Sequence, residues 1–167
     1  MYNRNQAIIE KERFKMNKLT IRDINESNIE AVKGVTRKQE QLSFIESVEE
    51  CLLEAAEYEQ WCPVAIYHEE DIVGFAMYGA FGKNPDTWID RIIIDQKHQG
   101  KGYGKEAVRQ LIEIVTKKYK VNIVYLSFVE ENVVAKQMYE NMGFKYTGEY
   151  DPEGELIYEY NLEKVTE

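Results

Sequence analysis

Three glycines alternate through residues 95–115, DQKHQGKGYGKEAVRQLIEIV, at Gly100, Gly102 and Gly104, and a segment with helical apolar periodicity follows at once. The N-terminus of a helix carries unpaired backbone N–H groups and a partial positive charge. Glycines at such a point allow turns with positive φ and let the bare backbone approach a ligand. The stretch therefore predicts an anion cradle suited to phosphate, between a strand that ends near Asp95 and a helix that begins near Gly104.

The glycine spacing excludes two common nucleotide motifs. A P-loop requires G-x-x-x-x-G-K-[ST], which residues 100–105 do not supply. A dinucleotide site wants G-x-G-x-x-G directly after the first strand of its unit, with an acidic ribose ligand about twenty residues further on. The register here is G-x-G-x-G, and no acidic residue stands in an obvious ribose position. For the glycines alone, a tight strand-to-helix connection without a ligand remains the alternative interpretation.

Hydrophobic periodicity predicts the elements that must position this cradle. Alternating or fully apolar runs predict strands at 19–22, 64–67, 72–78, 87–95, 122–128, 144–149 and 156–161. Helical periodicity predicts helices at 28–38 with Ser27 as cap, 44–58, 104–119 and 132–142, and residues 82–86 are expected to form a loop. The strand at 87–95 is too apolar for an edge and is expected at the centre of the sheet, parallel to the strand at 122–128 through a right-handed crossover.

The composition fits one acidic globular domain. The 167 residues are 44% hydrophobic and carry a formal net charge of −9, which repels nucleic-acid phosphates and mildly favours a cationic ligand. Cys51 and Cys62 form no C-x-x-C pair, which suits a reducing cytosol. The sequence contains no Cys/His cluster of the kind that binds a metal, so no metal is expected. Without a membrane-length apolar run or a signal-peptide core in residues 1–15, we expect a cytoplasmic protein with neither membrane nor nucleic-acid partners.

Two linked motifs resemble those of a known family. Gln99-x-x-Gly102-x-Gly104 after an apolar strand looks like the acetyl-CoA pyrophosphate loop of the GNAT N-acetyltransferases. Residues 130–144, EENVVAKQMYENMGF, look like the N-x-x-A-x-x-x-Y-x-x-x-G-F block of the same family. The expected order β-α-α-β-β-β-α-β-α-β-β also matches. The resemblance covers roughly residues 19–162 and implies an α/β (α+β) GNAT fold, in which a mixed central sheet of about seven strands is flanked by about four helices.

Residues 1–15 form an N-terminal arm outside the likeness, and residues 16–167 are expected to be a single acetyltransferase domain. The arm has few apolar anchors and is expected to be dispensable, with Met16 as a candidate start of the chain. Alternatively, Ile8, Ile9 and Phe14 pack a short helix on the body or on a partner subunit. Whether the protein is a homodimer stays open.

Three short blocks of sequence resemble one group within this family. QLSFIES (41–47), VGFAMYG (73–79) and WIDRIIID (88–95) are similar to bacterial spermine/spermidine N-acetyltransferases. The likeness implies that an acetyl group passes from acetyl-CoA to a primary amine of a polyamine, by direct attack in a ternary complex and without a metal. The alternatives are an acetyltransferase for an aminoglycoside, an amino acid or a protein N-terminus, and a module that binds acyl-CoA without turnover.

A primary alkyl amine has a pKa of about 10.4, so at neutral pH a proton must be accepted before attack. His68 and His98 are the only histidines, and both are expected in exposed loops. Asp90 matches a position where related polyamine acetyltransferases carry an acidic residue, with Glu46, Glu49 and water as further proton acceptors. The structural alternative for Asp90 is an ion pair with the neighbouring arginine.

The resemblance also implies which residues protonate the leaving group, stabilise the oxyanion and bind the cofactor and the amine. Tyr139 matches the tyrosine that protonates the leaving thiolate, and a backbone N–H of Ile92 or Ile93 is expected at the oxyanion. Gln99 stands where the family often has Arg, so a donor is kept and a charge is lost. The residues expected to bind acetyl-CoA are Ile92, Ile93, Ile94, Gln99, Gly100, Lys101, Gly102, Tyr103, Gly104, Lys105, Asn132, Lys136 and Tyr139. Those expected at the amine are Glu46, Glu49, Asp90 and Trp88, with Phe44 and Tyr78 as further walls of the cleft.

Overall fold

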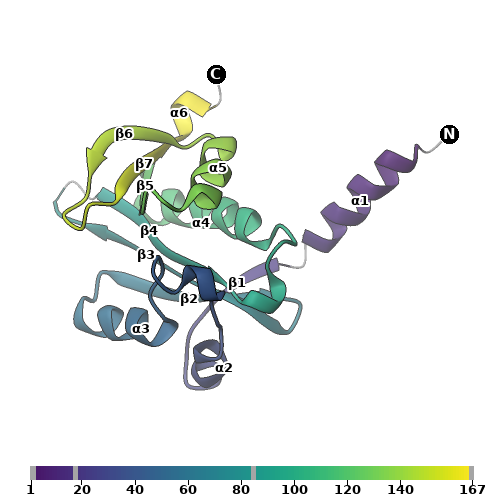
Figure 1. Ribbon diagram of the computed structural model, residues 1–167, viewed down its shortest axis with the longest axis horizontal. Helices are drawn as coiled ribbons and strands as arrows, with labels where there is room; N and C mark the ends of the chain where they lie inside the picture. Colours follow the sequence, from purple (N-terminus) through teal and green to yellow (C-terminus); the bar gives the residue numbers. More distant parts are fainter. Residues whose placement is uncertain (1–2, 17–18, 84–85, 166–167) are drawn as a thin grey trace.

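A seven-stranded mixed sheet forms the centre of the molecule in the computed structural model, which describes residues 3–16, 19–83 and 86–165 (Figure 1). Its order is β1-β2-β3-β4-β5-β7-β6, and all neighbours are antiparallel except β4 and β5. The predicted mixed sheet, the central place of β4 and its parallel neighbour are thereby confirmed. The strands are β1 (Leu19–Asp23), β2 (Trp61–His68), β3 (Asp71–Phe81), β4 (Asp86–Ile94), β5 (Ile123–Phe128), β6 (Lys145–Tyr150) and β7 (Leu156–Asn161). Residues 84 and 85 of the expected loop at 82–86 lie outside the described residues.

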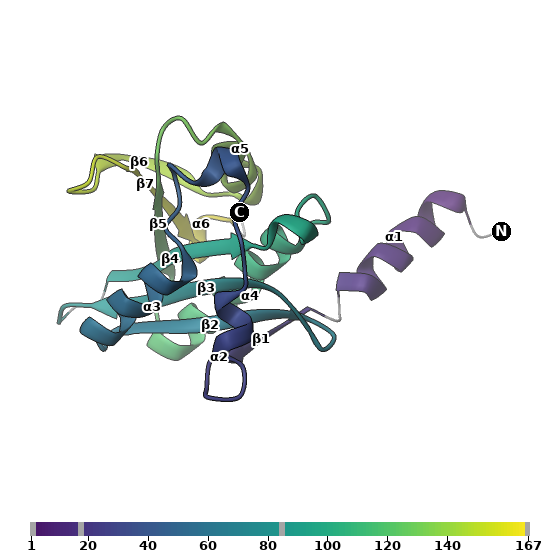
Figure 2. The same ribbon diagram turned by 60° about the horizontal axis from the view of Figure 1, so that its bottom comes forward.

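Helices cover both faces of the sheet (Figure 1; Figure 2). The helices of the described residues are α1 (Arg4–Met16), α2 (Ile29–Lys33), α3 (Val48–Glu57), α4 (Tyr103–Tyr119), α5 (Val133–Met142) and α6 (Leu162–Val165), with 3₁₀ turns η1 (Gln39–Gln41) and η2 (Gln96–His98). Two apolar cores result, one under α4 and α5 and one under α2 and α3. Within the described part of the chain, no helix has the length and apolar character needed to cross a membrane.

The helix α4 follows the sequence pattern closely. Its expected apolar face, which comprises Ala107, Val108, Leu111, Ile112 and Val115, is buried against the sheet. The helix begins at Tyr103, directly after the glycine at its N-cap, as the anion cradle requires. Burial of this face anchors the helix, so that the backbone N–H groups of its first turn are held at a fixed place.

The helix α2 is shorter than predicted. Asn28 stands at its N-cap instead of Ser27, whose N–H and hydroxyl both donate to the side chain of Asn25. Past the helix, the N–H and hydroxyl of Thr36 donate to Oδ1 of Asp95, at 2.9 and 2.8 Å. These bonds draw the chain out of the helical path and tie it to the end of β4.

The helix predicted at 44–58 begins only at its fifth residue. A reciprocal capping box explains the start: Ser47 Oγ accepts from Glu50 N at 3.2 Å, and Glu50 Oε2 accepts from Ser47 N at 2.7 Å. The segment from Phe44 to the cap is therefore free to turn toward the sheet. Of the expected apolar face, Val48, Leu52 and Ala55 pack into the core, while Ala56 is exposed.

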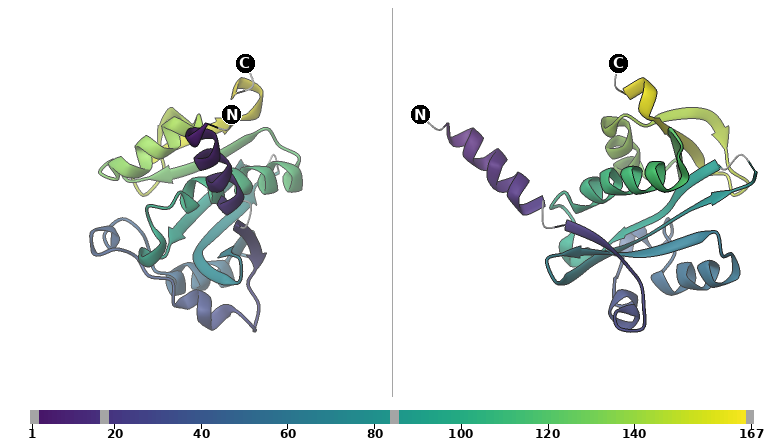
Figure 3. Two further views of the ribbon diagram at one scale, coloured as in Figure 1. Left: turned by 90° about the vertical axis from the view of Figure 1, so that its right-hand side faces the viewer. Right: turned by 180° about the vertical axis from the view of Figure 1, so that it is seen from behind.

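The arm forms a helix, α1, that projects from the body (Figure 1; Figure 3). Ile8 and Ile9 are 51% and 60% exposed, so the expectation that they pack on the body is wrong. The side chain of Phe14 lies outside the described part of the structure. That the arm is dispensable stays a prediction, as does a partner subunit that covers it.

Candidate active site

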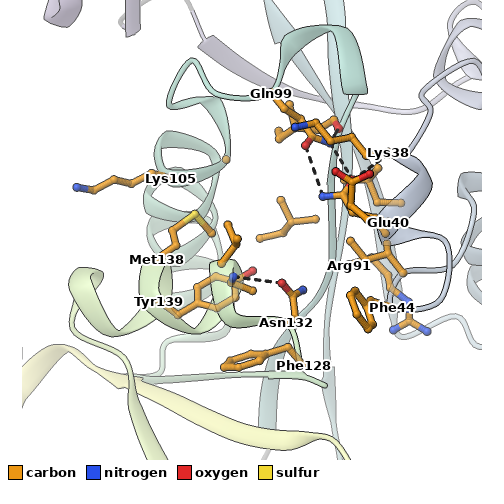
Figure 4. A pocket seen from close by; sticks show the side chains of 18 of the residues that line it. Lys38, Glu40, Phe44, Arg91, Gln99, Lys105, Phe128, Asn132, Met138 and Tyr139 are labelled. Atoms are coloured by element: carbon orange, nitrogen blue, oxygen red, sulfur yellow. Dashed lines mark hydrogen bonds between the residues drawn. The ribbon is translucent and has the colours of Figure 1, made fainter. Parts of the chain in front are cut away.

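A cavity of about 570 Å³ opens beside the carboxyl-terminal half of β4 (Figure 4). Among the described residues, β4 and β5 share one register pair, Trp88 with Tyr125, so their ladder does not continue toward Ile94 and Phe128. The cavity lies where this pairing is missing, and residues 90–94 of β4 line it together with Ser127 and Phe128 of β5. Its volume is that of a small-molecule site.

The separation of β4 from β5 leaves backbone donors facing the cavity. The N–H of Asp95 donates to Val73 O on β3 at 2.8 Å. Successive N–H groups alternate in direction along a strand. The N–H of Ile93 therefore also points toward β3, whereas the N–H groups of Ile92 and Ile94 point away from it. Of the two residues expected to supply the oxyanion donor, the alternation therefore favours Ile92.

A β-bulge lies at Asp90. In the register between β3 and β4, Met77 pairs with Arg91 and Tyr78 pairs with Ile89, which leaves Asp90 as an extra residue. A bulge bends a strand and turns the side chains next to it, and bulges are common beside active sites. As a result, both Asp90 and Arg91 line the cavity.

Arg91 gathers three carboxylates around one guanidinium. Its Nη1 pairs with Oδ2 of Asp90, its Nε lies 2.9 Å from Oε2 of Glu46, and its Nη2 lies 3.1 Å from Oε2 of Glu54. The expected ion pair of Asp90 and the approach of Glu46 to this strand are both present. Glu54, on α3, completes the cluster and shares Nη2 of Arg91 with Glu46.

Burial raises the pKa of Asp90 to about 7. The guanidinium of Arg91 opposes this rise, while the charges of Glu54 and Glu46 add to it. The side chain of Asp90 is only 15% exposed, so water screens these charges weakly. A carboxyl with a pKa near 7 can accept a proton at neutral pH and hand it on.

The glycine cradle lies at the other end of the cavity. Gly100 and Gly102 have φ of 78° and 84°, and the space beside Gly100 is open, with nothing within 4 Å of an added Cβ. Both glycines line the cavity with Tyr103, Gly104 and Lys105 at the start of α4. The backbone donors, the helix N-terminus and the room for close approach fit a phosphate group.

Gln99 is committed to the protein itself. Its Nε2 donates to Oε1 of Gln41 at 3.0 Å and to the carbonyl of Ile94 at 2.9 Å. The donor expected to be kept for phosphate thus ties η1 and β4 to the cradle. Lys38, on the same segment as Gln41, also lines the cavity beside Gln99 and brings a cation there (Figure 4).

Tyr139 lines the cavity from α5, opposite Phe44 and Arg91 (Figure 4). Its ring packs against Phe128 and Phe144, with centroids 5.6 and 5.5 Å apart. Burial raises the pKa of Tyr139 to about 12, so its phenol keeps its proton throughout the neutral range. Such a phenol can donate a proton into the cavity.

Asn132 sits at the N-cap of α5 and also lines the cavity. Its Oδ1 accepts from the N–H of Ala135 at 3.2 Å, while its amide nitrogen carries no hydrogen bond to the described residues. The side chain can therefore cap its helix and still donate to a bound ligand.

Some expected site residues do not line either cavity. Lys101 and Lys136 are absent from the lining, and Glu49 is exposed on the first turn of α3. Trp88 packs against Tyr125 instead, with ring centroids 5.4 Å apart. Tyr78, expected as a wall of the cleft, is buried in the core under α4, where its ring contacts that of Tyr119.

The two histidines are half-buried, and the expectation of exposed loop residues is wrong for both. Tyr103, which is buried at the start of α4, packs against the rings of His68 and His98, at centroid distances of 5.2 and 6.4 Å. His98 also lines the cavity. Both imidazoles thus help to hold the first residue of α4 in place.

Sequence reasoning missed Ser127 and Glu155, which line the cavity from β5 and from the turn before β7. A second cavity of about 180 Å³ shares them, together with Asp90 and Arg91. The remaining lining residues of this second cavity are Glu54, Asp151, Pro152 and Glu153. The acidic turn DPEGE, which ends at Glu155, was the available signal, but nothing in the sequence connects it to β4.

Comparison with known proteins gives consistent results. The model of the acetyltransferase (GNAT) family matches residues 29–144. The spermine/spermidine N(1)-acetyltransferase of Bacillus subtilis strain 168 is 40% identical over 145 residues, which are 83% of this chain and 95% of that protein. This chain is also 28% identical over 79 residues to the N-alpha-acetyltransferase RimI of Mycobacterium tuberculosis, a weaker similarity that covers 46% of this chain and 48% of that protein.

Solved structures share the fold. Spermidine N-acetyltransferase from Vibrio cholerae, in complex with CoA and spermine, superposes with a TM-score of 0.71 at 16% identity, covering 90% of this chain and 99% of that one. An aminoglycoside acetyltransferase in complex with coenzyme A superposes with a TM-score of 0.72 at 18% identity, covering 89% and 97%.

Proposed function

The chain belongs to the acetyltransferase (GNAT) family and is an acetyl-CoA-dependent N-acetyltransferase, and we propose that its acceptor is a primary amine of a polyamine such as spermine or spermidine. The observation that carries the proposal is the charge around the bulge in β4. Around Arg91, the two cavities are lined by six carboxylates, those of Asp90, Glu46, Glu54, Asp151, Glu153 and Glu155. Such a groove favours an acceptor with several positive charges.

Acetyl-CoA supplies an acetyl thioester, and the cradle and the unpaired part of β4 fit its phosphates and its chain. We assign the phosphate end to the backbone of residues 100–104, with Lys105 and Lys38 as nearby cations. The N–H of Ile92 faces the cavity between the cradle and Asp90, where it can donate to charge that develops on the thioester oxygen.

Proton transfer divides between two groups on opposite sides of the cavity. Asp90, with its pKa of about 7, accepts the proton that the ammonium group must lose. Tyr139, with its pKa of about 12, holds a proton at its phenol oxygen for the departing thiolate. Different surroundings thus give these groups opposite roles at one pH.

Spermidine and spermine should be acetylated with kcat/KM at least about tenfold higher than n-butylamine, because the carboxylates around the bulge outnumber the single guanidinium of Arg91. Raising the ionic strength should increase the KM of the polyamines more than that of the monoamine, since screening weakens attraction by the groove. Thiol release from acetyl-CoA measures both effects. Equal efficiency on all three amines would contradict the polyamine proposal, and a panel with an aminoglycoside and a peptide N-terminus would identify the replacement.

Gly102→Val should lower the affinity for CoA about tenfold or more. A β-branched residue is strained at the φ of 84°, and its side chain would intrude on the phosphate cradle. Titration calorimetry with CoA measures the change. Gly82→Val is the matched control, because Gly82 has a φ of 86° and open space around it but lies outside the cavities. Unchanged affinity in the Gly102 variant, or an equal loss in the control, would show that the phosphates bind elsewhere.

A further inference from the structure

The carboxylate of Glu155 differs from the others in the main cavity. Asp90 and Glu46 are already paired with Arg91. Glu155 is half-buried, and within the described part of the chain it forms no ion pair. The other glutamates of the lining are exposed, namely Glu40 and Glu131. Glu155 is therefore a carboxylate that is partly removed from water and has no ion-pair partner among the described residues.

The turn before β7 holds Glu155 in a defined position. Oδ1 of Asp151 accepts from the N–H groups of Glu153 and Glu155, at 2.9 and 2.8 Å, and the N–H of Asp151 donates to Glu155 O at 2.9 Å. The hydroxyl of Ser127, on β5, donates to Oε2 of Glu155 at 3.0 Å. One carboxylate oxygen is thereby oriented, and Oε1 is left to accept from a ligand.

Glu155 also stands at the junction of the two cavities. It lines both, as do Asp90, Arg91 and Ser127, so the smaller cavity continues the larger one past the bulge. An acceptor whose reacting amine lies at Asp90 has its chain directed along this route. Burial raises the pKa of Glu155, which the hydrogen bond from Ser127 and the charge of Arg91 oppose, and a bound ammonium group would favour the ionised form further.

We propose that Glu155 is a specificity-determining residue that binds the second ammonium group of the acceptor and so selects amines with two or more positive charges. The inference rests on the proposed function and deepens it. A half-buried carboxylate gains more from an ammonium partner than an exposed one does, because less water competes for it. A monoamine leaves Glu155 without a partner and gains nothing from it.

The test is Glu155→Gln, which removes the charge and keeps an oxygen to accept from Ser127. Loss of one charge-assisted hydrogen bond should lower kcat/KM for spermidine about 10- to 100-fold, mainly through KM. The value for n-butylamine should stay within about twofold, and so should the KM for acetyl-CoA. Glu149→Gln is the matched control, since Glu149 is exposed on β6 and lines neither cavity, so that it reports the loss of net charge alone.

The substrate comparison separates binding from a structural role. An equal fall for spermidine and n-butylamine, or a fall no larger than that of Glu149→Gln, would overturn the assignment of Glu155. If the wild-type enzyme instead acetylates spermidine no better than n-butylamine, the proposed polyamine function fails as a whole. A wild-type preference for spermidine that survives Glu155→Gln would leave that function intact and refute the role of Glu155 alone.

Discussion

Tyr139→Phe should lower kcat by about 10²- to 10⁴-fold, the range that general acid catalysis usually contributes. The phenol lines the cavity, and its pKa of about 12 keeps it protonated at every pH at which the enzyme is assayed. Phe preserves the packing against Phe128 and Phe144, so the fold and the affinity for CoA should stay nearly unchanged. The loss should be similar from pH 6 to pH 9, because Tyr139 does not titrate in this interval.

Steady-state thiol release gives kcat, and calorimetry with CoA checks the affinity. Tyr158→Phe is the matched control, since Tyr158 packs on Phe128 in the same aromatic cluster but donates to Glu140 and lies outside both cavities. A Tyr139 variant as fast as the wild type would remove this phenol from the mechanism. A loss of similar size in the Tyr158 variant would point to packing rather than to proton transfer.

Asp90→Asn should lower kcat at pH 8 by about 10²- to 10⁴-fold, since a positioned proton acceptor contributes in this range. The effect should depend on pH in a defined direction. Burial raises the pKa of Asp90 to about 7, so the accepting, ionised form is scarce below that value and complete above it. Wild-type kcat should therefore rise with pH through about 7 and reach a plateau, with about a tenth of the plateau at pH 6.

The variant should lose this rise, which a merely structural role would not remove. Asp86→Asn is the matched control, because Asp86 begins the same strand, is exposed and lines neither cavity. If Asp90→Asn retained the rise through pH 7, another group would be the proton acceptor. Glu155 and Glu46 would be the next to test, since both line the same cavity.

The sheet and the cradle could be predicted because each depends on local pattern. The apolar run of β4 required a central strand, and the glycines before α4 required a helix start with an exposed backbone. The ends of α2 and α3 were predicted less well. Bonds from Thr36 to Asp95 and the capping box of Ser47 decide them, and helical periodicity carries neither signal.

The acceptor side of the site was harder to predict than the cofactor side. The bulge at Asp90 follows from the register against β3, which no single strand reveals. Glu155 reaches the cavity only because β7 pairs with β5, a contact between segments far apart in the sequence. Conversely, Trp88 has the aromatic side chain expected of a binding residue, but its position before the bulge places it against Tyr125.

The gap between β4 and β5 has a consequence for how this protein withstands unfolding and misassembly. Each unpaired stretch is in effect an edge strand, and edge strands normally invite foreign chains to pair with them. Here the two unpaired stretches line the cavity, together with the starts of α4 and α5. We expect the amide groups of bound CoA to form hydrogen bonds with the unpaired backbone groups of these two strands. The cosubstrate would then extend the sheet between β4 and β5. Because a ligand that binds only the folded state stabilises it, the enzyme without CoA should have a lower melting temperature than the enzyme with CoA bound.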